Sequence, residues 1–111
     1  MAASRPPRRG EIWLAALDPT LGSEIQKTRP CVVVSPPDMN EHLRTMVVAP
    51  MTTGSRPAPF RIPITFQRKS GLILLDQLRT LDRQRLVKRL GVANAATLAN
   101  VLDGLQAMFA P

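Results

Sequence analysis

A charged loop that leads into an apolar strand carries the side chains best suited to chemistry. The segment GSEIQKTR, residues 22–29, holds a carboxylate, Glu24, and two cations, Lys27 and Arg29, directly before a β-branched run. A polar loop at the mouth of a buried strand presents side chains on a rigid support. Because a guanidinium binds phosphate or carboxylate oxygens through a planar fork, Arg29 is predicted to be the central residue.

The remaining reactive side chains exclude several kinds of site. His42 is the only histidine, so one chain cannot form a two-histidine acid/base pair, although two copies across a dimer remain an alternative. Cys31 is the only cysteine, which excludes an intramolecular disulfide and a cysteine-based metal site. The acidic residues Glu24, Asp76 and Asp82 lack the spacing of metal ligands. No metal and no cofactor is expected.

The charge of the chain favours an anionic partner. Lysine and arginine number 15 against 8 acidic residues, for a net charge of +7, and only three of these cations are lysines. Arginine-rich surfaces suit polyanions such as nucleic acid or an acidic protein segment. The alternative, a basic surface that serves only solubility, stays open on charge alone.

Length and composition predict one domain. The 111 residues suffice for one modest core, which we place at residues 9–111, with residues 1–8 as a flexible basic tail. No apolar run approaches the ~20 residues of a membrane span, and the basic N-terminus lacks the apolar region of a signal peptide. With its single cysteine, the chain is expected in the reducing cytoplasm and away from membranes.

Hydrophobic patterning predicts short strands followed by one helix. Apolar and β-branched runs bounded by proline, glycine and polar turns indicate strands, and apolar residues recur at helical spacing after Asn94, a predicted N-cap. We expect a mainly β fold, a small antiparallel barrel with a C-terminal α-helix. The expected strands are Glu11–Leu17, Pro30–Ser35, Thr45–Met51, Phe60–Phe66, Gly71–Thr80 and Leu86–Leu90.

Three blocks of the sequence resemble one known family. The chain reads GEIWLAALDPTLGSEIQKTRPCVVVS, then VVAPMTTG, then ILLDQLRTLDRQRL, in an order and at a spacing similar to the MazF/PemK (Kid) toxins. The resemblance runs from about residue 9 to residue 109. It implies an SH3-like barrel shared with the gyrase poison CcdB. It also implies a metal-independent, ribosome-independent endoribonuclease that cleaves single-stranded RNA, forms a homodimer, and is held inactive by an antitoxin.

The resemblance also assigns residues. By position it implies that Arg29 and Thr52 take part in catalysis, and Thr53 directly after Thr52 leaves open which hydroxyl acts. Arg29 would stabilise charge on the phosphate, with proton transfer as a secondary alternative. Glu24, from its place in the loop, would orient Arg29 or serve as base, and a purely structural ion pair between the two is the alternative. From their places at loop mouths and strand ends, and not from the resemblance, the predicted RNA contacts are Lys27, Arg56, Gln77 and Arg79, with Thr53 beside Thr52; a solvated basic rim is the alternative.

Three functions remain to be distinguished. The first is a sequence-specific endoribonuclease toxin that cleaves mRNA by attack of the 2′-hydroxyl and so inhibits translation, with a cognate antitoxin whose acidic C-terminal segment covers the basic groove. The second is a non-catalytic poison that binds DNA gyrase as CcdB does. The third is a degenerate member that only sequesters RNA or antitoxin. The RNA sequence that is cleaved is not predicted.

Overall fold

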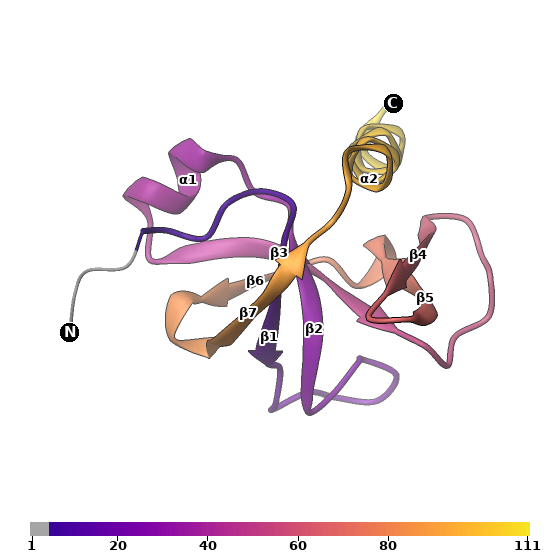
Figure 1. The fold of residues 1–111 in the computed structure, drawn as a ribbon, viewed down its shortest axis with the longest axis horizontal. Coiled ribbons are helices and arrows are strands. Elements are labelled where there is room, and N and C mark those ends of the chain that lie inside the picture. Colours follow the sequence, from indigo (N-terminus) through magenta and orange to yellow (C-terminus); the bar gives the residue numbers. More distant parts are fainter. Residues whose placement is uncertain (1–4) are drawn as a thin grey trace.

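Seven strands and two helices make up the chain in the computed structural model, which describes residues 5–111 (Figure 1). Two short 3₁₀ turns, η1 and η2, interrupt the second half. The strands are β1 Glu11–Ala16, β2 Thr28–Val33, β3 Thr45–Thr52, β4 Arg61–Phe66, β5 Lys69–Leu74, β6 Arg79–Asp82 and β7 Leu86–Val92. The remaining elements are α1 Pro37–His42, η1 Leu75–Gln77, η2 Arg83–Arg85 and α2 Ala95–Phe109.

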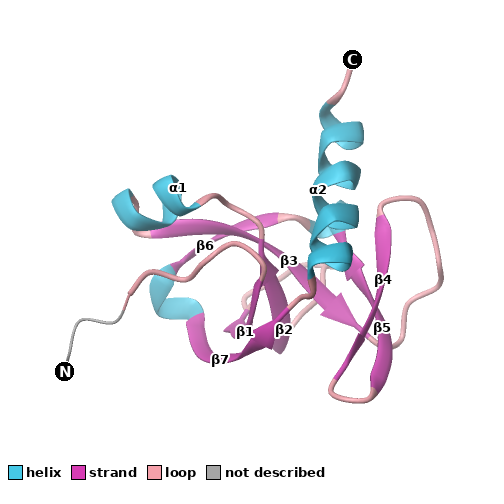
Figure 2. Cartoon of the chain, turned by 45° about the horizontal axis from the view of Figure 1, so that its top comes forward, coloured by secondary structure: helices cyan, strands magenta, loops and turns pink. Residues whose placement is uncertain are grey.

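All strand pairs are antiparallel, in the order β4-β5-β3-β2-β1-β7 (Figure 2). β3 is the shared strand: β2 pairs with one of its edges, while β6 and β5 divide the other edge between them. Residues 45–48 of β3 pair with β6, and residues 51–52 pair with β5. This division bends the sheet into a small barrel-like shape and leaves the C-terminal end of β3, with its threonines, where the two parts meet.

The curled sheet buries apolar side chains on both faces. Val32 of β2 and Met51 of β3 belong to one cluster, which α2 covers, while Cys31 and Val33 belong to a second cluster. Successive residues of β2 therefore point into different cores, which explains why this strand reads as apolar throughout. The burial of Cys31 confirms its interpretation as a core residue.

A tight hairpin joins β4 to β5. Phe66 pairs with Lys69, and the two residues between them, Gln67 and Arg68, both have positive φ, of 51° and 65°. This is the geometry of a type I′ turn, which suits the twist of a two-residue hairpin. β4 lies at an end of the sheet, as expected for a strand that contains Pro63. The hairpin sets Lys69 beside the end of β3.

The C-terminal helix forms as its periodicity predicts. Asn94 caps it by accepting a hydrogen bond from the Thr97 N–H at 2.8 Å. Val101 is fully buried, and Leu105 and Met108 pack on the first cluster, whereas Phe109 at the end is 71% exposed. Within residues 5–111 no helix has the length and hydrophobicity to cross a bilayer.

The described part of the N-terminal segment packs on the sheet. Of the predicted tail, residues 1–4 lie outside the described residues, whereas Pro7 is buried and its carbonyl accepts a hydrogen bond from Asn40. Arg5 and Arg89 both pair with the buried carboxylate of Glu11, at 2.6 and 3.1 Å. The Trp13 indole donates to the same carboxylate at 3.1 Å. Residues 5–8 are therefore fastened to β1 and β7 by one buried carboxylate.

The mainly β fold with a small antiparallel barrel and a C-terminal helix is confirmed, and one predicted element is wrong. The expected strand over residues 71–80 divides into β5, η1 and β6. The Leu78 N–H donates to the Leu75 carbonyl at 3.2 Å and so closes a 3₁₀ turn. Before the turn, β5 pairs with the C-terminal end of β3. After the turn, β6 pairs with the N-terminal half of β3.

Candidate functional site

Arg29 is the second residue of β2, and most of its guanidinium has no partner within residues 5–111. It is exposed, and its Nε donates to the Gln26 carbonyl at 3.3 Å. Among the described residues, the two terminal nitrogens of Arg29 have no hydrogen-bond or ion-pair partner. A guanidinium held through Nε with free terminal nitrogens is suited to bind an anion through its fork.

Thr52 ends β3 with its hydroxyl oriented by the following turn. Its Oγ1 accepts a hydrogen bond from the Gly54 N–H at 3.2 Å. Because a hydroxyl both accepts and donates, this contact leaves the hydroxyl hydrogen available for an external acceptor. Thr52 is half-buried, and Thr53 beside it is exposed.

The strand register brings Arg29 and the threonines together. Cys31 pairs with Pro50 and Val32 with Ala49, and the same register continued along β2 and β3 sets Arg29 opposite Thr52. Both residues line one cavity of about 220 Å³, which we name the arginine–threonine cavity. Its lining is Arg29, Pro30, Met51, Thr52, Thr53, Ile64, Phe66, Gln67, Lys69 and Gly71.

Lys69 is a candidate that the sequence did not single out. It lines the arginine–threonine cavity as the first residue of β5, so a second cation accompanies Arg29. In the sequence it sits inside QRKSG, which reads only as a polar turn. The signal that would have revealed it is the pairing of β5 with the end of β3, which is a long-range contact.

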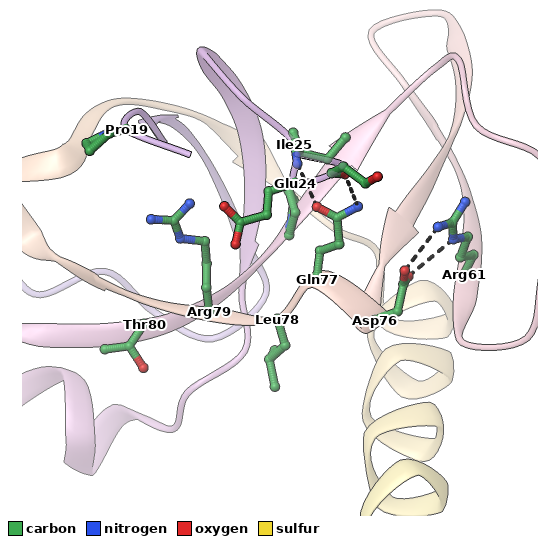
Figure 3. A pocket seen from close by; sticks show the side chains of 11 residues that line it. Pro19, Glu24, Ile25, Arg61, Asp76, Gln77, Leu78, Arg79 and Thr80 are labelled. Carbon is green, nitrogen blue, oxygen red and sulfur yellow. Dashed lines mark hydrogen bonds and ion pairs between the residues drawn. The ribbon is translucent and has the colours of Figure 1, made fainter. Parts of the chain in front are cut away.

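A second and larger cavity lies beside the loop between β1 and β2 (Figure 3). It measures about 780 Å³, and we name it the loop cavity. At one end Arg61 and Asp76 form a two-point ion pair, with nitrogen–oxygen distances of 3.2 and 3.0 Å. Its lining is Pro19, Ser23, Glu24, Ile25, Pro50, Arg61, Asp76, Gln77, Leu78, Arg79 and Thr80.

The structure separates Glu24 from Arg29. The Glu24 carboxylate accepts a hydrogen bond from the Leu21 N–H at 2.6 Å and lines the loop cavity. The described residues contain no ion pair between Glu24 and Arg29, so the purely structural pair that the sequence left open does not form here. Figure 3 shows Glu24 and Arg79 directed into the same space. Glu24 and Arg29 line different cavities, and the orienting role of Glu24 stays a prediction.

The other predicted RNA contacts are distributed around the two cavities. Gln77 and Arg79 line the loop cavity, and Arg79 also donates to the Leu17 carbonyl at 3.2 Å. Lys27 and Arg56 are exposed and line neither cavity. Lys27 has a φ of 68°, and its N–H is held by the Asp18 carboxylate at 2.9 Å. Together these residues form a basic rim that extends beyond the cavities.

The thiol of Cys31 is buried in the second core cluster and lines neither cavity. Burial raises the pKa of the Cys31 thiol to about 12, with a smaller opposing effect from Arg79. A thiol with this pKa is protonated at neutral pH and is a poor nucleophile. In residues 5–111 no three histidine, cysteine or acidic side chains gather as metal ligands would. The arginine–threonine cavity therefore offers two cations and two hydroxyls, which are groups that bind an anion.

Comparison with known proteins identifies the family. Residues 8–109 match the family described as PemK-like, MazF-like toxin of type II toxin-antitoxin system.

The chain belongs to the PemK/MazF toxin family.

The chain is similar to endoribonuclease PemK of Escherichia coli, with 41% identity over 103 residues that cover 87% of this chain and 77% of that protein. Its fold is similar to the crystal structure of MazF from Deinococcus radiodurans, with a TM-score of 0.83, 30% identity, and coverage of 95% and 97%. A MazE–MazF structure from the same organism matches with a TM-score of 0.77, 27% identity, and coverage of 95% and 96%. These findings support the RNA-cleaving alternative over the gyrase poison.

Proposed function

We propose that this chain is the endoribonuclease toxin of a type II toxin–antitoxin system and cleaves single-stranded mRNA at the arginine–threonine cavity. The observation that carries the proposal is the convergence of Arg29 and Thr52 on one cavity, in a chain 41% identical to a named endoribonuclease. A fork of free guanidinium nitrogens opposite a hydroxyl donor matches the non-bridging oxygens of a phosphodiester.

The reaction uses a nucleophile that the substrate supplies. The ribose 2′-oxygen attacks phosphorus while its proton leaves, the bond between phosphorus and the 5′-oxygen breaks, and that oxygen takes up a proton. The products end in a 2′,3′-cyclic phosphate and a 5′-hydroxyl. Arg29 and Thr52 donate to the non-bridging oxygens as negative charge develops, and the Lys69 ammonium adds positive charge at the same cavity. In this mechanism the protein's main contribution is electrostatic.

Two residues are candidates for the proton transfers of the reaction, Arg29 and Glu24. Arg29 retains proton transfer as a secondary role, and the role of Glu24 as base or orienting group stays a prediction, since its carboxylate faces the loop cavity here. Lys27, Thr53, Arg56 and Arg79 are proposed to contact the RNA chain around the cut. Single-stranded RNA suits such a rim because its bases and phosphates are both accessible.

The proposed assembly is a homodimer controlled by an antitoxin. The net charge of +7 suits an antitoxin whose acidic C-terminal segment lies over the basic rim. A matching fold in a MazE–MazF structure supports such a partner. Cytoplasmic mRNA is the proposed substrate pool, which agrees with a single free, buried cysteine.

Cleavage of protein-free RNA tests the proposal. Purified protein is incubated with long single-stranded RNAs in EDTA, and the fragment ends are mapped. We expect cuts at a short recurring sequence, with 2′,3′-cyclic phosphate ends. Intact RNA across several long substrates, together with gyrase-dependent DNA breaks, would instead support the gyrase poison. Salt-sensitive binding without any cleavage would indicate the degenerate member.

A further inference from the structure

Gln77 uses its side-chain amide to hold the loop between β1 and β2. It ends η1, and its Oε1 accepts a hydrogen bond from the Ile25 N–H at 2.7 Å. Its Nε2 also reaches the Ser23 carbonyl, at 3.5 Å. Figure 3 shows both contacts across the loop cavity. The sequence predicts Gln77 as an RNA contact, and in the structure its acceptor oxygen is bound to the loop.

Arginine side chains fasten the beginning of this loop, and Lys27 at its end is held by the Asp18 carboxylate and by the Leu17 N–H. Arg85 donates to the Ala16 and Asp18 carbonyls at 3.1 and 2.5 Å, and Arg79 donates to the Leu17 carbonyl. Among the described residues, side-chain hydrogen bonds from Gln77 and from Arg29 join residues 21–26 to other elements. Of these two side chains, Gln77 is the one that comes from a segment distant in the sequence, while two arginines secure the base of the loop.

Gln77 binds the residue directly before the carbonyl that holds the Arg29 guanidinium. Ile25, whose N–H Gln77 binds, precedes Gln26, and the Gln26 carbonyl accepts the hydrogen bond from Arg29 Nε. Ile25 also packs against the second core cluster, so this part of the loop has a defined place. A contact sequence thus runs from Gln77 through Ile25 and Gln26 to Arg29. If the loop tip moves, the group that aims the guanidinium moves with it.

We infer that Gln77 is a positioning residue, a latch that holds the loop tip so that the Gln26 carbonyl keeps Arg29 aimed at the phosphate. The inference rests on the proposed function for its catalytic consequence. Its structural part, the latch itself, is independent of RNA.

Two substitutions of Gln77 separate the latch from a direct RNA contact. Gln77→Met removes the acceptor and keeps the length of the side chain, whereas Gln77→Glu keeps an acceptor for the Ile25 N–H. The matched control is Gln106→Met on the exposed side of α2. Amide proton exchange is measured by NMR on the RNA-free proteins, and kcat and KM are measured with one fluorogenic single-stranded RNA.

The latch predicts a specific set of changes. In Gln77→Met, exchange of the Ile25 amide accelerates about 3- to 10-fold, the range expected for losing one neutral hydrogen bond. The value of kcat falls by a similar factor while KM changes less, because fewer molecules hold Arg29 in position. Gln77→Glu restores slow exchange, and Gln106→Met matches the wild type in both measurements.

Unchanged exchange of the Ile25 amide in Gln77→Met would overturn the latch. If that unchanged exchange is accompanied by a shifted cut sequence, Gln77 contacts RNA directly. A wild-type protein that cleaves no RNA would contradict the proposed function, yet the exchange of Ile25 would still decide the latch. The two failures are therefore distinguishable.

Discussion

The guanidinium of Arg29 differs from those of Arg61 and Arg85 in what it is bound to. The Arg61 guanidinium forms a two-point ion pair with Asp76, and a terminal nitrogen of Arg85 donates hydrogen bonds to two loop carbonyls. Arg29 is held through Nε alone. Its free fork, opposite a threonine hydroxyl, is what makes it suited to bind the reacting phosphate.

Arg29→Lys tests whether the fork itself is needed. Lysine keeps the positive charge but supplies a single ammonium, so it cannot bind two phosphate oxygens from fixed directions. We expect kcat to fall by about 10²-fold or more, in the range seen when an oxyanion donor is lost. Single-turnover cleavage measures the effect. Arg44 lies next to the opposite end of β3, so the control variant Arg44→Lys should retain wild-type activity. Wild-type activity in Arg29→Lys would contradict the need for a fork.

Glu11 shows how one buried carboxylate makes stability depend on pH. Burial alone would raise its pKa, but hydrogen bonds from Arg5, the Arg8 N–H and Trp13, together with the charge of Arg5, lower the pKa to about 2. Because the folded pKa is depressed, the stabilisation is complete above the unfolded pKa near 4.5 and is lost as pH falls toward 2. The difference corresponds to about 3 kcal/mol.

Glu11→Gln should abolish this pH dependence and lower stability at neutral pH. The amide weakens the charge-assisted hydrogen bonds from the half-exposed Arg5 and Arg89, which costs about 1–3 kcal/mol at pH 7. Urea unfolding at several values between pH 5 and pH 2 measures both effects. Glu41→Gln on α1 is the control, since Glu41 is exposed. A wild-type slope that survives in Glu11→Gln would show that other carboxylates carry the effect.

At the scale of elements, the site depends on how closely β5 approaches the end of β3. A Cβ added at Gly71 would lie 2.6 Å from the Thr52 carbonyl oxygen, which is backbone and cannot easily shift. A Cβ at Gly104 on α2 would meet Leu75 Cδ1 at the same 2.6 Å, but this is the end of a flexible side chain. The two glycines thus have equal clearances and different neighbours.

Gly71→Ala should therefore impair both stability and cleavage. Forcing β5 away from β3 costs about 1–3 kcal/mol and displaces Thr52 from Arg29, so kcat should fall at least 10-fold. In Gly104→Ala the strain is offset in part by the ~1 kcal/mol helix preference of alanine, and cleavage should stay near wild type. Thermal unfolding and cleavage assays measure both variants. Equal loss of activity in the two would mean that the approach of β5 does not position Thr52.

Local patterning accounts for most elements, and long-range contacts account for the rest. The strands near Glu11, Thr45 and Leu86 and the helix after Asn94 follow from alternation, breakers and a cap. Residues 75–78 carry no glycine or proline, so nothing local indicates the turn between β5 and β6. Its side chains instead bind Arg61 and the loop at Ile25, and these partners are distant in sequence.

Local sequence patterns likewise account for part of the candidate site, and loop conformation accounts for the rest. Arg29 and Thr52 line one cavity because the second and third strands pair antiparallel, whereas the apolar runs indicate the strands but leave their pairing open. Glu24 was expected beside Arg29 on sequence proximity alone. A tight turn, in which its carboxylate binds the Leu21 N–H, directs it to the loop cavity instead. Loop conformation is set by such local hydrogen bonds, which composition does not indicate.

At the scale of the whole molecule, charge governs how strongly RNA or an acidic antitoxin segment binds. A net charge of +7 over 111 residues, with exposed Arg56 and Lys27 outside both cavities, predicts contacts to phosphates beyond the cut. Such contacts release counterions, so affinity falls as salt rises. They contribute to binding without taking part in the chemistry.

Arg56→Ala should reduce the salt dependence of RNA binding and leave the cut sequence largely unchanged. Each phosphate contact to single-stranded RNA contributes about −0.7 to the slope of log K against log salt, so the slope should become shallower by about that amount. Fluorescence anisotropy with a non-cleavable RNA measures it, and Arg44→Ala is the control. An unchanged slope would place Arg56 outside the RNA path.

The central claim, that Arg29 and Thr52 act on one phosphate, is tested most directly by single-turnover cleavage with Arg29→Ala, Thr52→Ala and the double variant, each verified as folded. Acting as a unit, the two residues should be non-additive. We expect Arg29→Ala to lower the rate by about 10²- to 10³-fold and the double variant to be only about 10-fold slower than Arg29→Ala. Wild-type rates in either single variant, or effects that multiply fully in the double variant, would contradict the shared site.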